Sequence, residues 1–305
     1  MEPAKPTTAT ATSSAEPRPF DRRAFFLALF VSLLWGAGYP ISQGAMAFCT
    51  PCKFAALRFL LAALVLSPLL PSLPQKLRQL TQKEKLALAF ITLLFALNFA
   101  FTLWGVYVEG ANQTAVLMNL IVLWTVIFAH WLLPDDKIDG RKVAGLLCGL
   151  VGAVVVTSGQ GALGRWSLGN VFPLVATFCI SLQNVLIRKY LTRVDPFTIL
   201  HVEILVAAPL LGLVSTIFES GSVSWTPPFI FGLVYTGIMT TCLAFYMWYH
   251  LLTTYPVSTV AIMTFSIPVF AMVASYVANS TVPTWEQMVG AALIAAAIFA
   301  TNRGK

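Results

Sequence analysis

Leu33–Pro40, with the sequence LLWGAGYP, lies in the middle of an apolar run that extends from about Ala24 to Ala47. A helix needs roughly 20 apolar residues to cross the hydrocarbon core of a bilayer, and this run is long enough. Pro40 stands inside it and cannot donate a hydrogen bond to the carbonyl group of Gly36. The stretch therefore predicts a membrane-spanning helix with a kink near its centre.

The composition of the whole chain points to a membrane protein. Hydrophobic residues make up 58% of the 305 residues and charged residues only 10%, whereas about 25% of the residues of a soluble domain are charged. Ten apolar runs follow one another, over residues 24–47, 52–72, 86–108, 111–133, 143–159, 169–188, 196–218, 228–249, 256–278 and 285–302. We therefore predict an all-α membrane protein with ten transmembrane helices and little mass outside the membrane.

The ends of the predicted spans fix an orientation. Residues 1–23 are rich in Ala, Thr, Pro and Ser and have little to bury, so we expect a disordered tail. If this tail is cytoplasmic, Lys53 and Arg165 are the only cations that fall outside, and Arg58 lies within the second span. Short cytoplasmic loops carry the positive excess, so the sequence predicts that both termini are cytoplasmic in the cell (inner) membrane. The net charge of +7 then reflects topology and anionic lipid rather than nucleic-acid binding.

Two cysteines form a C-x-x-C pattern in the first outer loop. Cys49 and Cys52 suit either a structural disulfide or two free thiols, and the sequence leaves both open. A zinc site would need two further ligands. We therefore predict no metal site.

The second half of the chain repeats the first half at an offset of 145 residues. Pro51 then aligns with Pro196, and five spans and every loop stay in register. Because each half has an odd number of crossings, the second half enters the membrane upside down relative to the first, as in many secondary transporters. We predict one five-helix repeat over residues 24–159 and an inverted one over residues 169–302.

Several segments resemble a known family by their order and spacing. They are LLWGAGYPISQGAM, KFAALRFLLAALVL, GANQTAVLMNLIVLWTVIFAHWLL with GRKVAGLLCGLVGAVVV, and the second copy STVAIMTFSIPVFAMVASYV with WEQMVGAALIAAAIFA. Together they resemble the EamA family of the drug/metabolite transporter (DMT) superfamily over nearly the whole chain after the tail. The resemblance implies ten spans in two inverted repeats, and the transport of small metabolites, often the export of amino acids. It also implies a central cavity lined by spans one, three, four, six, eight and nine.

The chain departs from that family pattern at two places. The acidic residue that follows the fourth span is present as Asp135 and Asp136, but the second repeat has Ser280 and Thr281 at the corresponding position. The family pattern also has a proline in the fourth span, at the position that corresponds to Pro268, but this chain has Leu123 there. These departures make the two repeats chemically unequal.

Polar residues at membrane depth are the candidates for a substrate site, because in lipid a polar side chain needs a partner or a cavity. In the first span Trp35, Tyr39 and Gln43 share one face by their i, i+4 spacing. The other candidates are Asn98, Asn119, Gln183, Asn184, Tyr246, Tyr249, Thr264 and Ser266. The alternative for each is an interhelical hydrogen bond worth about 1 kcal/mol.

Gly36, Pro40 and Pro268 are the predicted hinges, since proline interrupts the first and ninth spans. The alternative is a kink that only serves close helix packing.

Two charges lie within spans. Arg58 is expected in the outer third of the membrane, as a candidate coupling or charge residue, and the alternative is an arginine that snorkels or bonds within the bundle. Glu203 is expected in the inner third, roughly 10 Å into the bilayer. Because burial disfavours the charged form of a carboxyl group, Glu203 suits a proton-coupling role. Its alternative is a neutral, hydrogen-bonded side chain or one held by Arg188 or Arg193.

The candidate residues narrow the function. Carriers of organic phosphates need several cations and a dication site needs more acid, whereas amide and aromatic groups suit a small neutral or zwitterionic solute. The chain has no Ser-His-Asp order, H-E-x-x-H or P-loop glycine signature, so we predict neither an enzyme nor a bound cofactor.

We predict a secondary transporter, monomeric or dimeric, that exports a small polar metabolite by alternating access, with the proton as a candidate coupling ion. The alternatives are an importer or exchanger, or a non-transporting sensor or scaffold.

Overall fold

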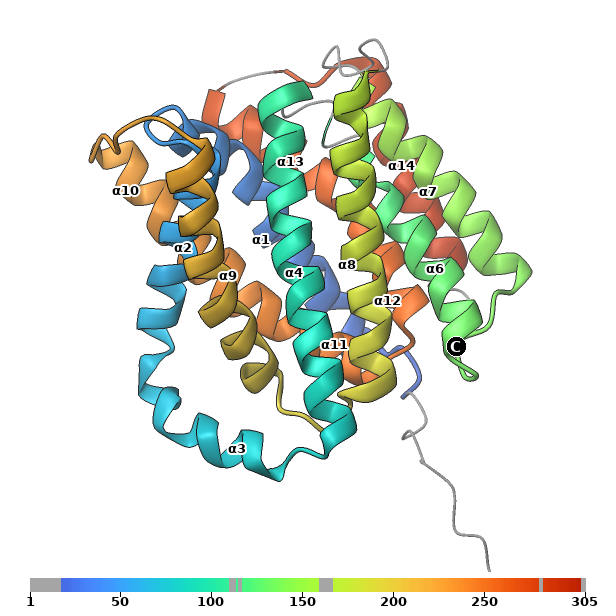
Figure 1. Cartoon of the computed structure of the whole chain (residues 1–305). Coiled ribbons are helices and arrows are strands. Elements are labelled where there is room, and N and C mark those ends of the chain that lie inside the picture. Colours follow the sequence, from blue (N-terminus) through green and yellow to red (C-terminus); the bar gives the residue numbers. More distant parts are fainter. Residues whose placement is uncertain (1–17, 110–113, 115–116, 159–166, 280–281, 303–305) are drawn as a thin grey trace, which may run out of the picture.

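The computed structural model describes residues 18–109, 114, 117–158, 167–279 and 282–302 (Figure 1). All regular secondary structure in this part of the chain is helical, which confirms the predicted all-α class. The elements in chain order are α1 (Arg22–Met46), α2 (Pro51–Val65), η1 (Ser67–Ser72), α3 (Leu73–Gln79), α4 (Gln82–Glu109), α6 (Leu120–Leu132), α7 (Gly140–Ser158), η2 (Leu168–Asn170), α8 (Val171–Tyr190), α9 (Pro196–Phe218), α10 (Pro227–Val234), η3 (Tyr235–Ala244), α11 (Phe245–Thr254), α12 (Val257–Met263), η4 (Thr264–Ser266), α13 (Ile267–Asn279) and α14 (Trp285–Asn302). Residues 1–17 of the predicted tail, Arg165 and the pair at 280–281 lie outside the described residues.

Several helical runs are long and apolar enough to cross a membrane. Among the described residues there are six, over Arg22–Met46, Gln82–Val108, Leu168–Tyr190, Pro196–Phe218, Pro227–Thr254 and Val257–Val277. The pair formed by α2 and the segment Ser67–Gln79 makes a seventh if it counts as one span. Large apolar side chains such as Phe26 (61% exposed) and Leu60 (61% exposed) face away from the other helices. Such a surface requires a lipid environment.

The second predicted span, residues 52–72, is not one straight helix. The helix α2 ends at Val65, and the segment Ser67–Gln79 turns away from it by 67°. Pro68 and Pro71 stand directly after the break, and a proline disfavours the helical conformation of the residue that precedes it. The apolar run therefore continues as η1 and α3 along one end of the molecule (Figure 1).

The first helix begins earlier than predicted. The carboxylate of Asp21 accepts a hydrogen bond from the backbone N–H of Ala24 and so caps α1 at Arg22. Phe20 is buried and its ring packs edge-on against Tyr255. Residues 18–23 are therefore ordered, because this short segment carries one aromatic residue to bury and one residue to cap.

The main helix contacts join the two halves of the chain. The most extensive contacts are those of α7 with α14, α4 with α8, α2 with α9, and α1 with α13 (Figure 1). Between α7 and α14 the backbones approach so closely that a Cβ atom on Gly152 would lie 2.8 Å from the carbonyl oxygen of Gly290. The two halves thus interlock helix by helix instead of forming separate bodies.

The helices form a bundle with two ends, named here after α3 and after Cys49. The α3 end holds α3, the start of α1 and the ends of α8 and α11, and the backbone N–H of Arg18 there donates to the carbonyl oxygen of Thr254. The Cys49 end holds the loop between α1 and α2 and the loop after α9, which are joined by a hydrogen bond from the N–H of Ser224 to the carbonyl oxygen of Phe48.

Candidate functional site

Glu203 lies at the centre of a buried polar group on α9, α8 and α11. The Nε2 atom of Gln183 donates to one carboxyl oxygen of Glu203 at 2.8 Å and lies 3.2 Å from the hydroxyl oxygen of Tyr249. The hydroxyl group of Tyr249 donates to the other carboxyl oxygen. All three side chains are fully buried. Two residues named from the sequence for different reasons, Gln183 and Glu203, are therefore direct partners.

A second polar pair lies at neighbouring positions of α8 and α11, where Asn184 follows Gln183 and Trp248 precedes Tyr249. The indole Nε1 of Trp248 donates to Oδ1 of Asn184 at 3.1 Å, and both side chains are buried. The ring of Trp35 packs edge-on against Trp248, with centroids 5.2 Å apart, and against Phe245 at 5.3 Å. The predicted residues Trp35 and Asn184 thus meet through Trp248.

Trp248 is not among the site residues predicted from the sequence. Its signal is a tryptophan that directly precedes Tyr249 in the eighth predicted span.

The first helix is tied to an irregular part of the eighth predicted span. The segment η3 is a π-helix in which the hydroxyl of Thr241 donates to the carbonyl of Thr236, five residues earlier. The indole of Trp35 donates to the carbonyl oxygen of Thr240 at 3.3 Å, and the hydroxyl of Tyr235 donates to the carbonyl of Leu34 at 3.1 Å. Such π-helical turns occur frequently at functional sites, and nothing in the sequence indicated this one.

The predicted hinge residues have different surroundings. The helix α1 continues through Pro40, and Gly36 lets it approach α13 so closely that a Cβ atom would lie 2.6 Å from Cβ of Phe270. The ninth predicted span is interrupted at η4, directly before Pro268. The close contact at Gly36 agrees with the alternative in which the kink only serves close packing of the helices.

Arg58 on α2 lies beside the rings of Phe59 and Phe99, and Asn98 directly precedes Phe99 on α4. The guanidinium carbon of Arg58 is 5.1 Å from the ring centroids of both Phe59 and Phe99. Its Nε atom and the Oδ1 atom of Asn98 are buried without a hydrogen-bond partner among the described residues. Phe99 contacts Phe245, which connects this region to Trp35.

The remaining predicted residues are not brought into this group. The side chain of Tyr39 is 47% exposed and that of Gln43 is exposed. The ring of Tyr246 stacks on Phe197, and the hydroxyl of Thr264, directly after α12, donates to the carbonyl of Ala261 three residues earlier. Ser266 likewise bonds to a nearby carbonyl, that of Met263. Asn119 lies directly before the first turn of α6.

Charged side chains fasten the α3 end. Asp136 is buried, accepts hydrogen bonds from the N–H and the hydroxyl of Ser258, and lies 2.6 Å from Nζ of Lys142. The guanidinium group of Arg188 donates to the carbonyl of Thr253 at 2.7 Å and to Asp135 at 3.1 Å. These contacts join the end of α6 to α8, α11 and α12.

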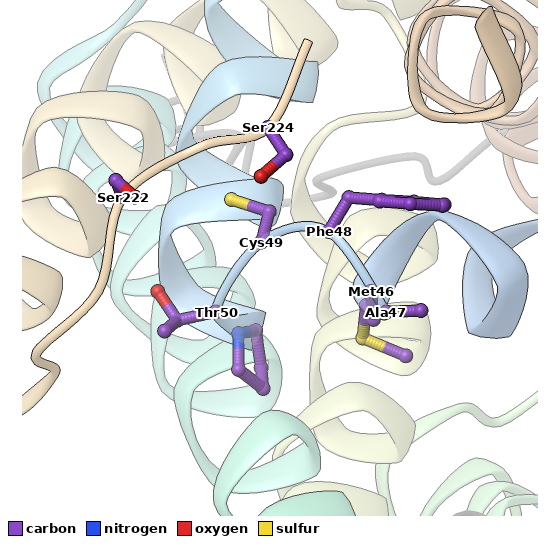
Figure 2. A pocket seen from close by; sticks show the side chains of 8 residues that line it. Met46, Ala47, Phe48, Cys49, Thr50, Ser222 and Ser224 are labelled. Atoms are coloured by element: carbon purple, nitrogen blue, oxygen red, sulfur yellow. The ribbon is translucent and has the colours of Figure 1, made fainter. Parts of the chain in front are cut away.

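At the Cys49 end, Cys49 and Cys52 are free and buried. Figure 2 shows the Cys49 side chain in a surface hollow that Ser222 and Ser224 also line. Burial raises the pKa of the Cys49 thiol above its ordinary value of 9.0, although Lys53 acts in the opposite direction. Of the two states that the sequence left open, the structure shows free thiols. The described residues contain no cluster of His, Cys, Asp and Glu side chains that would hold a metal ion.

The apolar helices, which interlock across the two halves of the chain around buried aromatic and amide groups, place the protein in the class of multi-pass helical membrane proteins. Residues 22–158 and again residues 167–303 match the EamA-like transporter family. The chain therefore belongs to the EamA-like transporter family, which confirms the resemblance drawn from its sequence. The repeated match indicates an internal duplication.

Several known proteins are similar over most of their length. An uncharacterized transporter of Bacillus subtilis, YvbV, is 28% identical, with 93% of this chain and 92% of the relative covered. A second transporter of the same organism, YoaV, is 26% identical and covers 88% of this chain and 93% of the relative. A solved crystal structure has the same fold, with a TM-score of 0.79 and 21% identity over 91% of this chain and 95% of that chain.

The chain is thus a multi-pass membrane transporter with a small-molecule substrate, and not an enzyme.

Proposed function

We propose that this chain is a ten-helix secondary transporter that exports a small polar metabolite, such as an amino acid, by alternating access. The observation that carries the proposal is the group of buried and partly buried side chains that both halves of the chain build together. Trp35 comes from the first half, and Asn184 and Trp248 come from the second. A site shared by two similar halves can open to either side of the membrane when the halves move relative to each other.

The ten spans and the inverted repeats are part of this proposal. Besides the long helical runs, α6 and the segment Trp285–Ala300 are shorter apolar helices, and α7 has 19 residues. Two family matches of similar length support five-helix repeats over residues 24–159 and 169–302. Two repeats with an odd number of crossings are necessarily inverted.

The orientation follows from the charges. Of the described cations outside the spans, the α3 end carries nearly all, including Lys76, Lys83 and Arg141, whereas Lys53 lies at the Cys49 end. A positive excess is typical of cytoplasmic loops. We therefore place the protein in the cell (inner) membrane, with the α3 end and both termini on the cytoplasmic side. Labelling from outside should reach Lys53 but not residues 76–85.

The substrate class follows from the polar groups at membrane depth. Arg58 and Glu203 are the charges far from both ends of the described helices, and the other polar candidates are amide, hydroxyl and aromatic side chains. A small neutral or zwitterionic solute matches such groups. The proposed substrate contacts are Trp35, Tyr39, Gln43, Asn98, Asn119, Gln183, Asn184, Tyr246 and Thr264, with Gly36, Pro40 and Pro268 as hinges.

Counterflow in proteoliposomes tests the proposal. Vesicles that contain the purified protein are loaded with one unlabelled amino acid or nucleobase at a time, and the uptake of the same labelled solute is measured. We expect uptake that depends on one internal solute and is abolished by Asn184→Leu, with Ser222→Ala as a matched control in the outer loop. The absence of a signal for every solute, from folded protein, would contradict this substrate class.

A further inference from the structure

We propose that Glu203, Tyr249 and Gln183 form a proton-binding site, and that the proton exchanged there drives transport of the solute. Glu203 takes up one proton from the side to which the transporter is open, and an O–H bond forms on its carboxyl group. It releases the same proton on the other side while one solute molecule moves in the opposite direction. This inference rests on the proposed function, because it names the driving ion of that transport.

Among the described residues, no positive charge is paired with Glu203. Its carboxyl oxygens contact Gln183 and Tyr249. A fully buried carboxylate without a cation is strongly disfavoured unless it binds a proton or several donors. Intramembrane carboxyl groups of this kind are typical of proton pathways.

Charged groups on the surrounding helices have other partners. Arg188 on α8 is held by Asp135 and the carbonyl of Thr253, and Arg58 on α2 lies over aromatic rings. Lys76 on α3 pairs with Asp195 at the start of α9.

The remaining titratable groups lie elsewhere. His201 on α9 has its ring nitrogens 3.1 Å from the carbonyl oxygen of Phe197 and 2.9 Å from that of Leu66. Tyr246 stacks on Phe197, and His250 is exposed. Among the described side chains, the other titratable groups of α4 and α8 are the buried Cys179 within α8, and Lys83, Glu84, Lys85, Tyr107, Lys189 and Tyr190 near the helix ends.

A second argument comes from Gln183, which carries a spare hydrogen-bond acceptor. Its Oε1 atom is buried and has no partner among the described residues, while its Nε2 atom donates to Glu203. The amide can rotate by half a turn, so that Oε1 faces the carboxyl group. A protonated Glu203 would then donate to Gln183, while Tyr249 still donates to the second carboxyl oxygen. The same three side chains therefore serve both protonation states.

The third argument is the position of the site. Gln183 and Asn184 are neighbours on α8, and their partners Tyr249 and Trp248 are neighbours on α11. The proton site is thus one residue away from the Trp35–Trp248 contact on both helices. If protonation of Glu203 changes the hydrogen bonds between α8 and α11, it therefore also changes the position of Trp248, which belongs to the aromatic group at which we place the solute.

Infrared difference spectroscopy tests proton binding without any solute. The full-length protein in lipid is compared between alkaline and acidic buffer, with protons as the only ligand. We expect the wild type to gain a band of a protonated carboxyl group that is missing in Glu203→Gln. The control is Glu84→Gln, because Glu84 is only half-buried at the start of α4 and glutamine can replace it in the hydrogen bond from Thr81. Identical spectra for wild type and Glu203→Gln would overturn the proposal.

An imposed pH gradient tests the coupling. With the solute that gives the counterflow signal, the wild type should accumulate it above the outside concentration. Glu203→Gln should retain counterflow but lose accumulation, so that the concentrations on both sides become equal. Accumulation that survives in Glu203→Gln would overturn the coupling. Failure of wild-type counterflow would remove the proposed function instead, and the infrared result would still decide whether Glu203 binds a proton.

Tyr249→Phe provides a second variant that keeps the carboxyl group and removes one hydroxyl. Because this hydroxyl donates to the carboxyl group, its loss weakens the charged form of Glu203. We expect the pH profile of gradient-driven accumulation, and that of the infrared band, to move to higher pH. Profiles that coincide with the wild type would exclude Tyr249 from the proton site.

Discussion

Asp136 at the α3 end and Glu219 at the Cys49 end perform the same task on opposite sides of the molecule. Asp136 accepts from the N–H of Ser258 in the first turn of α12, and Glu219 accepts from the N–H groups of Cys52 and Lys53 in the first turn of α2. Neither helix is capped by the side chain at its own N-cap position. In both places a carboxylate from one half of the chain accepts hydrogen bonds from N–H groups in the first turn of a helix of the other half.

The two ends differ in what surrounds the carboxylate. Asp136 is 2% exposed and also binds Lys142, and its neighbour Asp135 binds Arg188. Glu219 is half-buried and makes no ion pair among the described residues. The α3 end is thus fastened by a network of charges and the Cys49 end by hydrogen bonds to one carboxylate. We therefore expect substitutions of these carboxylates to reduce the stability of the fold more at the α3 end than at the Cys49 end.

The largest effect is expected for Asp136→Asn. The change leaves the ammonium group of Lys142 without its buried partner and removes charge from the first turn of α12, which we expect to destabilise the fold by about 3 kcal/mol. Thermal unfolding in detergent measures the loss. The control is Asp139→Asn, because the exposed Asp139 caps α7 and asparagine is an equally good cap. Equal losses in both variants would contradict the buried network.

Arg188→Gln should have the next largest effect. The variant loses the hydrogen bond to the Thr253 carbonyl and the ion pair with Asp135, which together are worth about 2 kcal/mol. The matched control is Lys189→Gln, since Lys189 lies over the ring of Tyr190 and pairs with no carboxylate among the described residues. A smaller loss for Arg188→Gln than for Lys189→Gln would show that the network does not hold α8 to α11.

Glu219→Gln should destabilise the protein by about 1 kcal/mol, because one amide oxygen still caps α2. Its loss should be smaller than that of Asp136→Asn under the same conditions. The reverse order of the two variants in thermal unfolding would refute the comparison between the two ends.

The smallest effect is the pH dependence at Glu219. Burial raises the pKa of Glu219, but the nearby hydroxyl group of Thr50, the hydrogen bond from the backbone N–H of Cys52 and the nearby hydroxyl group of Ser215 outweigh it and lower the pKa below its ordinary value of 4.5. A carboxyl group whose pKa is lower in the folded state stabilises the fold above 4.5, and this stabilisation is lost as the pH falls through the folded pKa. The difference in melting temperature between wild type and Glu219→Gln should therefore shrink below about pH 4.5. A difference in melting temperature that does not depend on pH would contradict a lowered pKa of Glu219 in the folded state.

Parts of the candidate site were predictable because a polar residue in an apolar run has few alternatives. This argument selected Trp35, Gln183, Asn184 and Glu203, which lie close together in the structure. It gave no partners, since the spacing within one helix says nothing about the helix that packs against it. Trp248 and the π-helix η3 were missed for that reason, and Tyr39 and Gln43, which share a face with Trp35, are exposed.

The sequence by itself determined the helical class, the approximate positions of the apolar segments and the family, because hydrophobic length and the order of motifs are properties of the chain alone. Only the tertiary structure decided that Glu203 meets Tyr249 and Gln183 instead of an arginine, and that Asp136 caps α12. These contacts join residues that are distant in sequence and depend on how α8, α9 and α11 pack. In an apolar bundle that packing is decided by the shapes and hydrogen bonds of facing side chains, which a linear pattern does not contain.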